Sequence, residues 1–383
     1  MKVWVIYDLP TGGGLKVLTH IVEALVESNL FDINLVVRKQ RNLSNLERDI
    51  INKANIVEIR NIPLPHPYSV AAIAKRIIDS ISNGNIVILV DDVPKILVEK
   101  KNCKIVCYVN YPHALRSKII EEHESIVTKI HKKIFRRFFV TDFVQILRHR
   151  NVLFLANSTR TKRHMEKYLQ IPSELIKLVY PPVELVDKVD FVSTSNAKQD
   201  LVVSVQPFDP NKKIEGLIHA VSLLHDRGLL NHANKVYVIG YLRSLQYFKY
   251  LTKIVEKLKL NNIVKLIPNA NRNFVEKLLE KSKVYVHTAP FEPFGIAVVE
   301  ALAKGCLPIV RRGFNGPWID ITKCGRYSLG YNTIEELAIN ITKAFKYYPM
   351  FDYNKCLKDI EKFSPRKFKV EIIKAIKEFL TSK

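Results

Sequence analysis

At 383 residues, the chain is too long for one typical hydrophobic core and fits two domains of ordinary size. Its 60 basic against 37 acidic side chains give a formal net charge of +23, which favours anionic partners such as nucleotides and lipid phosphates. No aromatic RNA-binding motif or recognition-helix pattern is present, so we do not expect nucleic acid as a partner. No apolar run approaches the roughly 20 residues that a membrane-spanning helix needs, and the first one, cut by Asp8, predicts a strand rather than a signal peptide.

The five cysteines predict neither a zinc site nor a disulfide framework. Three residues separate Cys103 from Cys107, and the other three cysteines stand alone. A reducing, cytoplasmic compartment is therefore the simplest expectation.

In chain order, short β-rich runs alternate with helical patterns, which predicts α/β layers on parallel sheets. In the first half we expect helices at 15–28 and 71–81, and strands at 2–8, 32–38, 85–92, 104–110, 151–158 and 175–181. Periodicity is lost over 189–200, a candidate linker. The first domain is therefore predicted to span 1–190.

The same pattern restarts after the candidate linker. We expect strands at 201–205, 235–240, 263–267, 283–288 and 307–310, which together predict a second βα domain over 200–362. An amphipathic helix at 366–380 has no following strand, so the segment 363–383 is expected to pack back toward the first domain. Ligands of open parallel sheets bind beyond the carboxyl ends of the strands, so the residues there are the candidates for a site.

The segment "PFEPFGIAVVE" places two glutamates, Glu292 and Glu300, eight positions apart around the start of an apolar helix. Amide groups near Phe294, Gly295 and Ile296 would lie at the helix N-terminus, where a diphosphate can bind. No Lys, Arg or His stands at 296 or 297 to pair with Glu300, which favours a ligand with hydroxyl groups. The alternative is a helix acid at Glu292 and a satisfied core residue at Glu300.

This glutamate spacing and the following "EALAKGCLPIV" resemble the nucleotide-sugar site of family 4 glycosyltransferases of the GT-B fold. Similar segments occur along most of the chain, including "TGGG", "YVNYP", "NSTRTKRHM", "VYPPVEL", "SVQPFDPNKK" and "NGPWIDI". The resemblance implies an α/β GT-B fold, in which two Rossmann-like domains face each other across an inter-domain cleft. The first domain would bind the acceptor and the second the nucleotide sugar.

The resemblance also implies a retaining hexosyltransferase, with mannose from GDP-mannose as the expected donor and a lipid-linked or other glycan as acceptor. A UDP-sugar donor (glucose or N-acetylglucosamine), a nucleotide-sugar epimerase and a non-catalytic basic binding protein are the alternatives. We expect no metal and no cofactor, because no D-x-D triad ends a strand and a lysine with helix amides can stabilise the leaving diphosphate.

Carried over to this sequence, the resemblance assigns Glu300 to the ribose, Glu292 to the donor sugar and Lys212 to the pyrophosphate. Gly13 and Gly14 would let backbone amides approach the donor phosphate or the acceptor.

Two positions depart from the family pattern. Pro207 stands where the family often carries an arginine, which Arg311, Arg312 or Arg243 would have to replace. Asn110 stands where relatives place a histidine. His113 either substitutes for that histidine or is an ordinary surface imidazole.

Residues 128–150 combine seven lysines and arginines with four phenylalanines at partly helical spacing. Such a segment favours peripheral contact with an anionic membrane, on its cytoplasmic face. The alternative is a helix that packs its phenylalanines on the first sheet.

Overall fold

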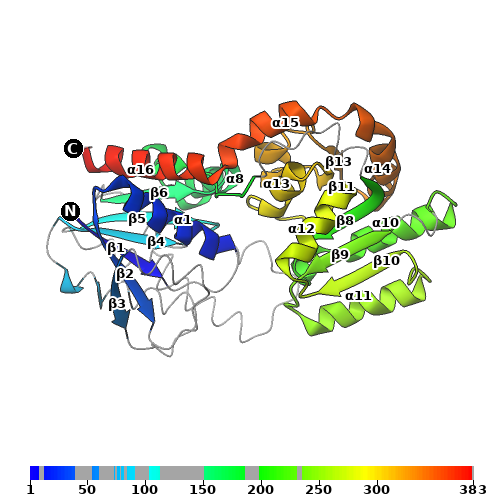
Figure 1. The fold of residues 1–383 in the computed structure, drawn as a ribbon, viewed down its shortest axis with the longest axis horizontal. Coiled ribbons are helices and arrows are strands. Elements are labelled where there is room, and N and C mark those ends of the chain that lie inside the picture. Colours follow the sequence, from blue (N-terminus) through cyan, green and yellow to red (C-terminus); the bar gives the residue numbers. More distant parts are fainter. Residues whose placement is uncertain are drawn as a thin grey trace. The chain divides into compact units, whose positions relative to one another are not determined.

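The computed structural model describes residues 1–7, 13–38, 54–59, 84–90, 103–112, 151–185, 198–230 and 235–381, with short pieces between 73 and 81. The chain divides into two compact units, each built on one parallel sheet (Figure 1). The first unit combines Met1–Pro182 with Pro365–Lys383, and the second comprises Val183–Ser364. The sequence prediction gave 1–190, 200–362 and 363–383 for the corresponding segments.

The first unit contains a seven-stranded sheet of order β3-β2-β1-β4-β5-β6-β7, with all pairs parallel. Strands β4 and β6 are buried along their whole length, as apolar strands covered on both faces should be. The strands are β1 (Lys2–Tyr7), β2 (Asp32–Arg38), β3 (Asn55–Ile59), β4 (Ile86–Val90), β5 (Lys104–Val109), β6 (Val152–Ala156) and β7 (Ile176–Leu178).

Two helices from opposite ends of the sequence pack together in this unit. The chain's last helix, α16 (Pro365–Thr381), lies beside α1 (Gly13–Ser28) (Figure 1). Its apolar stripe joins the buried cluster of β1, β5 and α1 through Phe368, Ile372, Ile376 and Phe379. Lys104 Nζ at the start of β5 donates to the carbonyl of Phe379 at 2.7 Å, which satisfies one open carbonyl in the last turn of α16.

The second unit contains a six-stranded parallel sheet of order β10-β9-β8-β11-β12-β13. Its strands are β8 (Gln199–Val205), β9 (Val236–Gly240), β10 (Val264–Pro268), β11 (Ser282–His287), β12 (Leu307–Arg311) and β13 (Leu329–Tyr331). Its helices are α10 (Glu215–Asp226), α11 (Leu245–Lys257), α12 (Arg272–Lys281), α13 (Ile296–Ala303), α14 (Ile334–Tyr347) and α15 (Tyr353–Ile360). The strand order reverses between β8 and β11, and such a switch point is where open α/β sheets bind ligands.

The predicted fold class is confirmed: both sheets are parallel and helices alternate with strands along the chain. The described parts contain two strands that the sequence did not predict, β3 and β13. The first is interrupted by Glu58, and the second has only three residues, so neither forms a recognisable apolar run. Strand β8 begins at Gln199, inside the predicted linker, whose residues 189–197 lie outside the described part of the chain.

Gly240 at the end of β9 tests how tightly the strand ends pack. A Cβ atom there would lie 1.8 Å from the carbonyl oxygen of Gln206, so Gly240→Ala must displace backbone. We expect it to cost about 1–3 kcal/mol of stability, read as a lower urea midpoint of unfolding. Gly216→Ala in α10 is the matched control, because no atom lies within 4 Å of its added Cβ. Equal midpoints for the two variants would show that the strand ends can part freely.

Candidate functional site

The site lies where the loops after β8 and β11 meet. Because these strands are parallel neighbours, both loops leave the sheet at its carboxyl edge. The loop after β8 forms a 3₁₀ turn, Pro210–Lys212, capped by Asp209, whose Oδ1 accepts from the amide of Asn211 at 2.9 Å. The turn ends at Lys213 in the left-handed conformation. This geometry fixes the backbone of Lys212 beside the end of β11.

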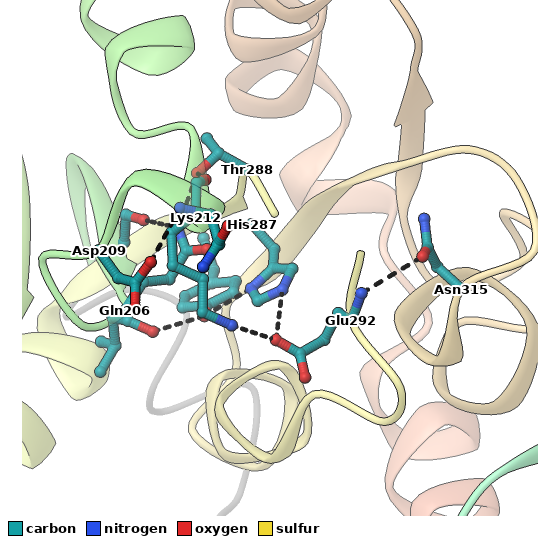
Figure 2. Close-up of polar contacts among 11 residues, drawn as sticks. Gln206, Asp209, Lys212, His287, Thr288, Glu292 and Asn315 are labelled. Carbon is teal, nitrogen blue, oxygen red and sulfur yellow. Dashed lines mark hydrogen bonds and ion pairs between the residues drawn. The ribbon is translucent and has the colours of Figure 1, made fainter. Parts of the chain in front are cut away.

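Buried hydrogen bonds connect the two loops. Thr288 donates its hydroxyl proton to the carbonyl of Lys212 at 2.6 Å. Gln206 Nε2 donates to Thr288 Oγ1 at 2.9 Å and to Ser204 Oγ at 2.8 Å. Gln206 and Thr288 are each 3% exposed, so water does not compete for these bonds. Figure 2 shows Gln206 and Thr288 close to the turn that carries Lys212.

Three ionisable side chains meet at this edge. Lys212 Nζ lies 2.6 Å from Glu292 Oε2, and Nε2 of the buried His287 lies 3.5 Å from the same oxygen (Figure 2). Burial raises the pKa of Glu292, but Lys212 and His287 outweigh it, so this pKa lies well below its usual value. Burial lowers the pKa of His287 by more than Glu292 raises it, so the imidazole is neutral at pH 7. The site therefore contains a fixed carboxylate, a lysine and a neutral imidazole.

A glycine-containing turn holds the backbone of Glu292. Asn315 Oδ1 accepts from the amide of Glu292 at 3.4 Å, and the amide of Gly316 donates to the carbonyl of Glu292 at 3.1 Å. A Cβ on Gly316 would lie 2.1 Å from the carbonyl oxygen of Pro293, so only glycine allows this approach. The "NGP" segment that the resemblance singled out thus supports the first glutamate.

Helix α13 begins at Ile296, after Gly295 with φ +101°. Its first turn carries no acidic residue, and no side chain of the described residues caps it. Its first amides therefore offer the partial positive charge of a helix N-terminus close to Glu292. The sequence predicted this arrangement of Phe294, Gly295 and Ile296 as a diphosphate site, and that role stays a prediction.

The structure corrects the interpretation of Glu300 as a buried carboxylate without a cation. Its side chain is 7% exposed, and its Oε1 lies 2.9 Å from Nη2 of Arg272, the first residue of α12. A search one turn away in the same helix could not find this partner, because it belongs to a different helix. The burial of Glu300 alone is therefore no evidence for a ligand.

The predicted residues of the first domain lie in the first unit. Gly13 and Gly14 are the first two residues of α1, and Asn110 directly follows β5. The carbonyl of Asn110 accepts from the hydroxyl of Thr161 at 3.2 Å. His113 and the segment 128–150 lie outside the described residues.

Of the three arginines considered as replacements at Pro207, Arg243 lies at the Lys212 turn. Its Nε pairs with Oδ2 of Asp209, the cap of that turn, at 3.2 Å. Arg312 instead pairs with the exposed Glu336 at 2.9 Å, and Arg311 ends β12. Arg243 thus contacts the turn that carries Lys212, and a role for it as the second phosphate cation stays a prediction.

Sequence reasoning assigned no role to several side chains that organise this site: Gln206, Arg272, His287, Thr288 and Asn315. Four of them belong to segments already singled out as strand ends or motif residues, so position could have found them. Arg272 had no such signal.

Among the described residues, no three His, Cys, Asp or Glu side chains are grouped so as to hold a metal ion, and every helix is too short or too polar to span a bilayer.

Comparison with solved structures defines the fold class as GT-B. A glycosyltransferase from Rickettsia africae ESF-5 is similar over 100% of this chain and 99% of its own, with a TM-score of 0.71 and 14% identity. Residues 186–346 match the family model "Glycosyl transferases group 1". The matched segment resembles a group 1 glycosyltransferase domain and contains Lys212, Glu292 and Glu300.

Curated relatives match longer segments. A GDP-Man:Man(3)GlcNAc(2)-PP-Dol alpha-1,2-mannosyltransferase from Dictyostelium discoideum is 24% identical over 72% of this chain and 59% of its own length. The O-antigen chain mannosyltransferase RfbU from Salmonella typhimurium is 25% identical over 56% of this chain and 58% of its own. The chain thus matches somewhat under two thirds of the length of either relative.

The titration of His287 tests the charge cluster that Lys212, Glu292 and His287 form. Lys212 lowers the pKa of this imidazole and Glu292 raises it. Lys212→Met should therefore raise the His287 pKa, and Glu292→Gln should lower it further, as followed by NMR with a His287→Asn variant for assignment. Lys213→Met, an exposed neighbour, should leave it unchanged. A His287 pKa that shifts in the same direction in Lys212→Met and Glu292→Gln would contradict this arrangement of the three side chains.

Proposed function

We propose that the chain is a retaining glycosyltransferase that moves mannose from GDP-mannose onto a lipid-linked glycan. One observation carries the proposal: Lys212, Glu292 and His287 form a charge cluster at the carboxyl edge of β8 and β11, inside the group 1 domain. The Dictyostelium and Salmonella relatives are both named mannosyltransferases, which supports the choice of mannose, and the name of the Dictyostelium relative supports GDP-mannose as donor.

The cluster suits the breaking of a sugar–phosphate bond. That bond leaves a nucleoside diphosphate, whose developing negative charge is stabilised by a fixed cation and by helix amides. In the proposal, Lys212 and the N-terminus of α13 bind the diphosphate. These groups supply the positive charge without a metal ion.

Lys212 has an anionic partner, Glu292, in this structure. The incoming phosphates must share its ammonium group with Glu292, which lies 2.6 Å away. As Lys212 turns toward the phosphates, acceptor positions on Glu292 become available to hydroxyls of the donor sugar. His287, neutral and buried, keeps the carboxylate oriented during this exchange.

Retention of the anomeric configuration places departure and attack on one face of the sugar. The leaving phosphate can then accept the proton of the acceptor hydroxyl, so the mechanism needs no separate carboxylate base. Asn110 and His113 are assigned to the sugar or acceptor side of the reaction.

A donor panel tests the proposal. The purified chain is incubated with radiolabelled GDP-mannose, UDP-glucose and UDP-N-acetylglucosamine, each with and without a lipid-linked glycan. We expect transfer from GDP-mannose only, dependent on the acceptor, and a loss of at least a hundredfold in turnover for Lys212→Met. Transfer from a UDP-sugar would mean that the donor is that UDP-sugar and not GDP-mannose. Epimerised sugar nucleotide without an acceptor, or binding without turnover, would replace the proposed function.

A lipid-linked acceptor requires contact with a membrane, for which the basic segment 128–150 is the proposed surface. Replacing Lys132, Lys133, Arg136 and Arg137 by Ser should weaken sedimentation with anionic liposomes at least tenfold, since each basic residue near such a surface contributes about 1 kcal/mol. The matched control replaces four exposed lysines in and after α11: Lys249, Lys253, Lys257 and Lys259. Equal loss in both variants would assign the binding to net charge alone.

A further inference from the structure

Arg272 bridges two carboxylates at the start of α12. Its Nη2 lies 2.9 Å from Oε1 of Glu300, and its Nε lies 2.6 Å from Oε1 of Glu276. The arginine side chain is 48% exposed, whereas that of Glu300 is 7% exposed. The half-exposed guanidinium of Arg272 thus contacts the buried carboxylate of Glu300 in α13.

Helix energetics do not explain an arginine at this position. A cation in the first turn of a helix opposes the macrodipole, which favours acids there. An arginine that precedes its glutamate by four residues is also the weaker orientation of a helical ion pair. The N-terminus of α12 is already capped, because Asn271 Oδ1 accepts from the amide of Phe274 at 2.8 Å. The contact that remains to account for Arg272 is Glu300.

The loop before Arg272 is fixed to the same edge of the sheet as the charge cluster. Asn269 adopts a left-handed conformation, with φ +55°. Its amide donates to the carbonyl of Gly240 at 2.8 Å, and its Oδ1 accepts from the amide of Leu242 at 2.8 Å. The loop after β10 is therefore tied to the loop after β9, which sets the backbone from which Arg272 extends.

We propose that Arg272 is a positioning residue for Glu300, which it holds in the orientation that binds the ribose of the nucleotide donor. The inference rests on the proposed function and adds a residue to that site. An ion pair to Oε1 orients the carboxylate without exhausting its acceptor capacity, since a carboxylate offers about four lone-pair positions.

A residue that acts through Glu300 should affect nucleotide binding and leave the chemical step nearly unchanged. We therefore expect Arg272→Met to raise KM for the donor about tenfold, with kcat within a factor of two. Arg272→Lys, which retains the charge, should recover part of the loss. Glu276→Gln is the matched control, because it removes the other carboxylate partner of Arg272 and leaves the contact with Glu300 in place.

The decisive measurement is a double-mutant cycle. Binding of free GDP and free UDP is measured by calorimetry for wild type, Arg272→Met, Glu300→Gln and the double variant. If Arg272 acts through Glu300, the double variant should bind no more weakly than Glu300→Gln alone. Melting temperatures of all four proteins show whether the change in affinity is separate from a change in stability.

The outcomes separate the inference from the proposed function. Additive losses in the double variant, or unchanged affinity in Arg272→Met, overturn the positioning role while the glycosyltransferase proposal stands. A wild-type protein that binds neither nucleotide overturns both. A lower melting temperature at wild-type affinity would make Arg272 a stabilising residue only.

Discussion

The ion pair between Lys212 and Glu292 depends on the order of strands in the second sheet. The two residues are 80 positions apart, and they meet because β8 and β11 are neighbours whose carboxyl ends lie at one edge. Thr288 and Gln206 then fix the backbone on both sides of the pair. Any change that separates these strand ends would remove the cluster, even if Lys212, Glu292 and His287 were all retained in the sequence.

Both glutamates of the site are paired with cations, and this has a chemical reason. A largely buried carboxylate without a cation would take up a proton, and a buried lysine without an anion would lose one. Lys212 is the cation at Glu292, whose pKa lies well below its usual value, and Arg272 pairs with Glu300. Under the proposed function, phosphates of the donor would pair with Lys212 and hydroxyl groups of the donor would pair with the glutamates, so binding need not create an unpaired charge.

Local patterns in the sequence predicted the layers of the fold and singled out Glu292 and Glu300 as candidate site residues. Strands, helix starts and the eight-residue spacing can all be recognised within short segments of sequence. Strands β3 and β13 were not predicted, because β3 is interrupted by a charged residue and β13 has only three residues. The partner of Glu300 could not be predicted at all. A half-exposed arginine in a charged helix resembles any surface residue, and its contact depends on which loops the sheet order brings together.

Helix α16 makes the first unit discontinuous in sequence. Residues 1–182 leave the ribosome long before residues 365–381, whose phenylalanines complete the buried cluster around α1 and β5. The first unit therefore cannot complete its core until the second unit has been synthesised, and part of that core stays uncovered until then. Chaperones that bind exposed apolar surface would meet this unit first, and premature termination near residue 364 would disable the half of the molecule made earliest.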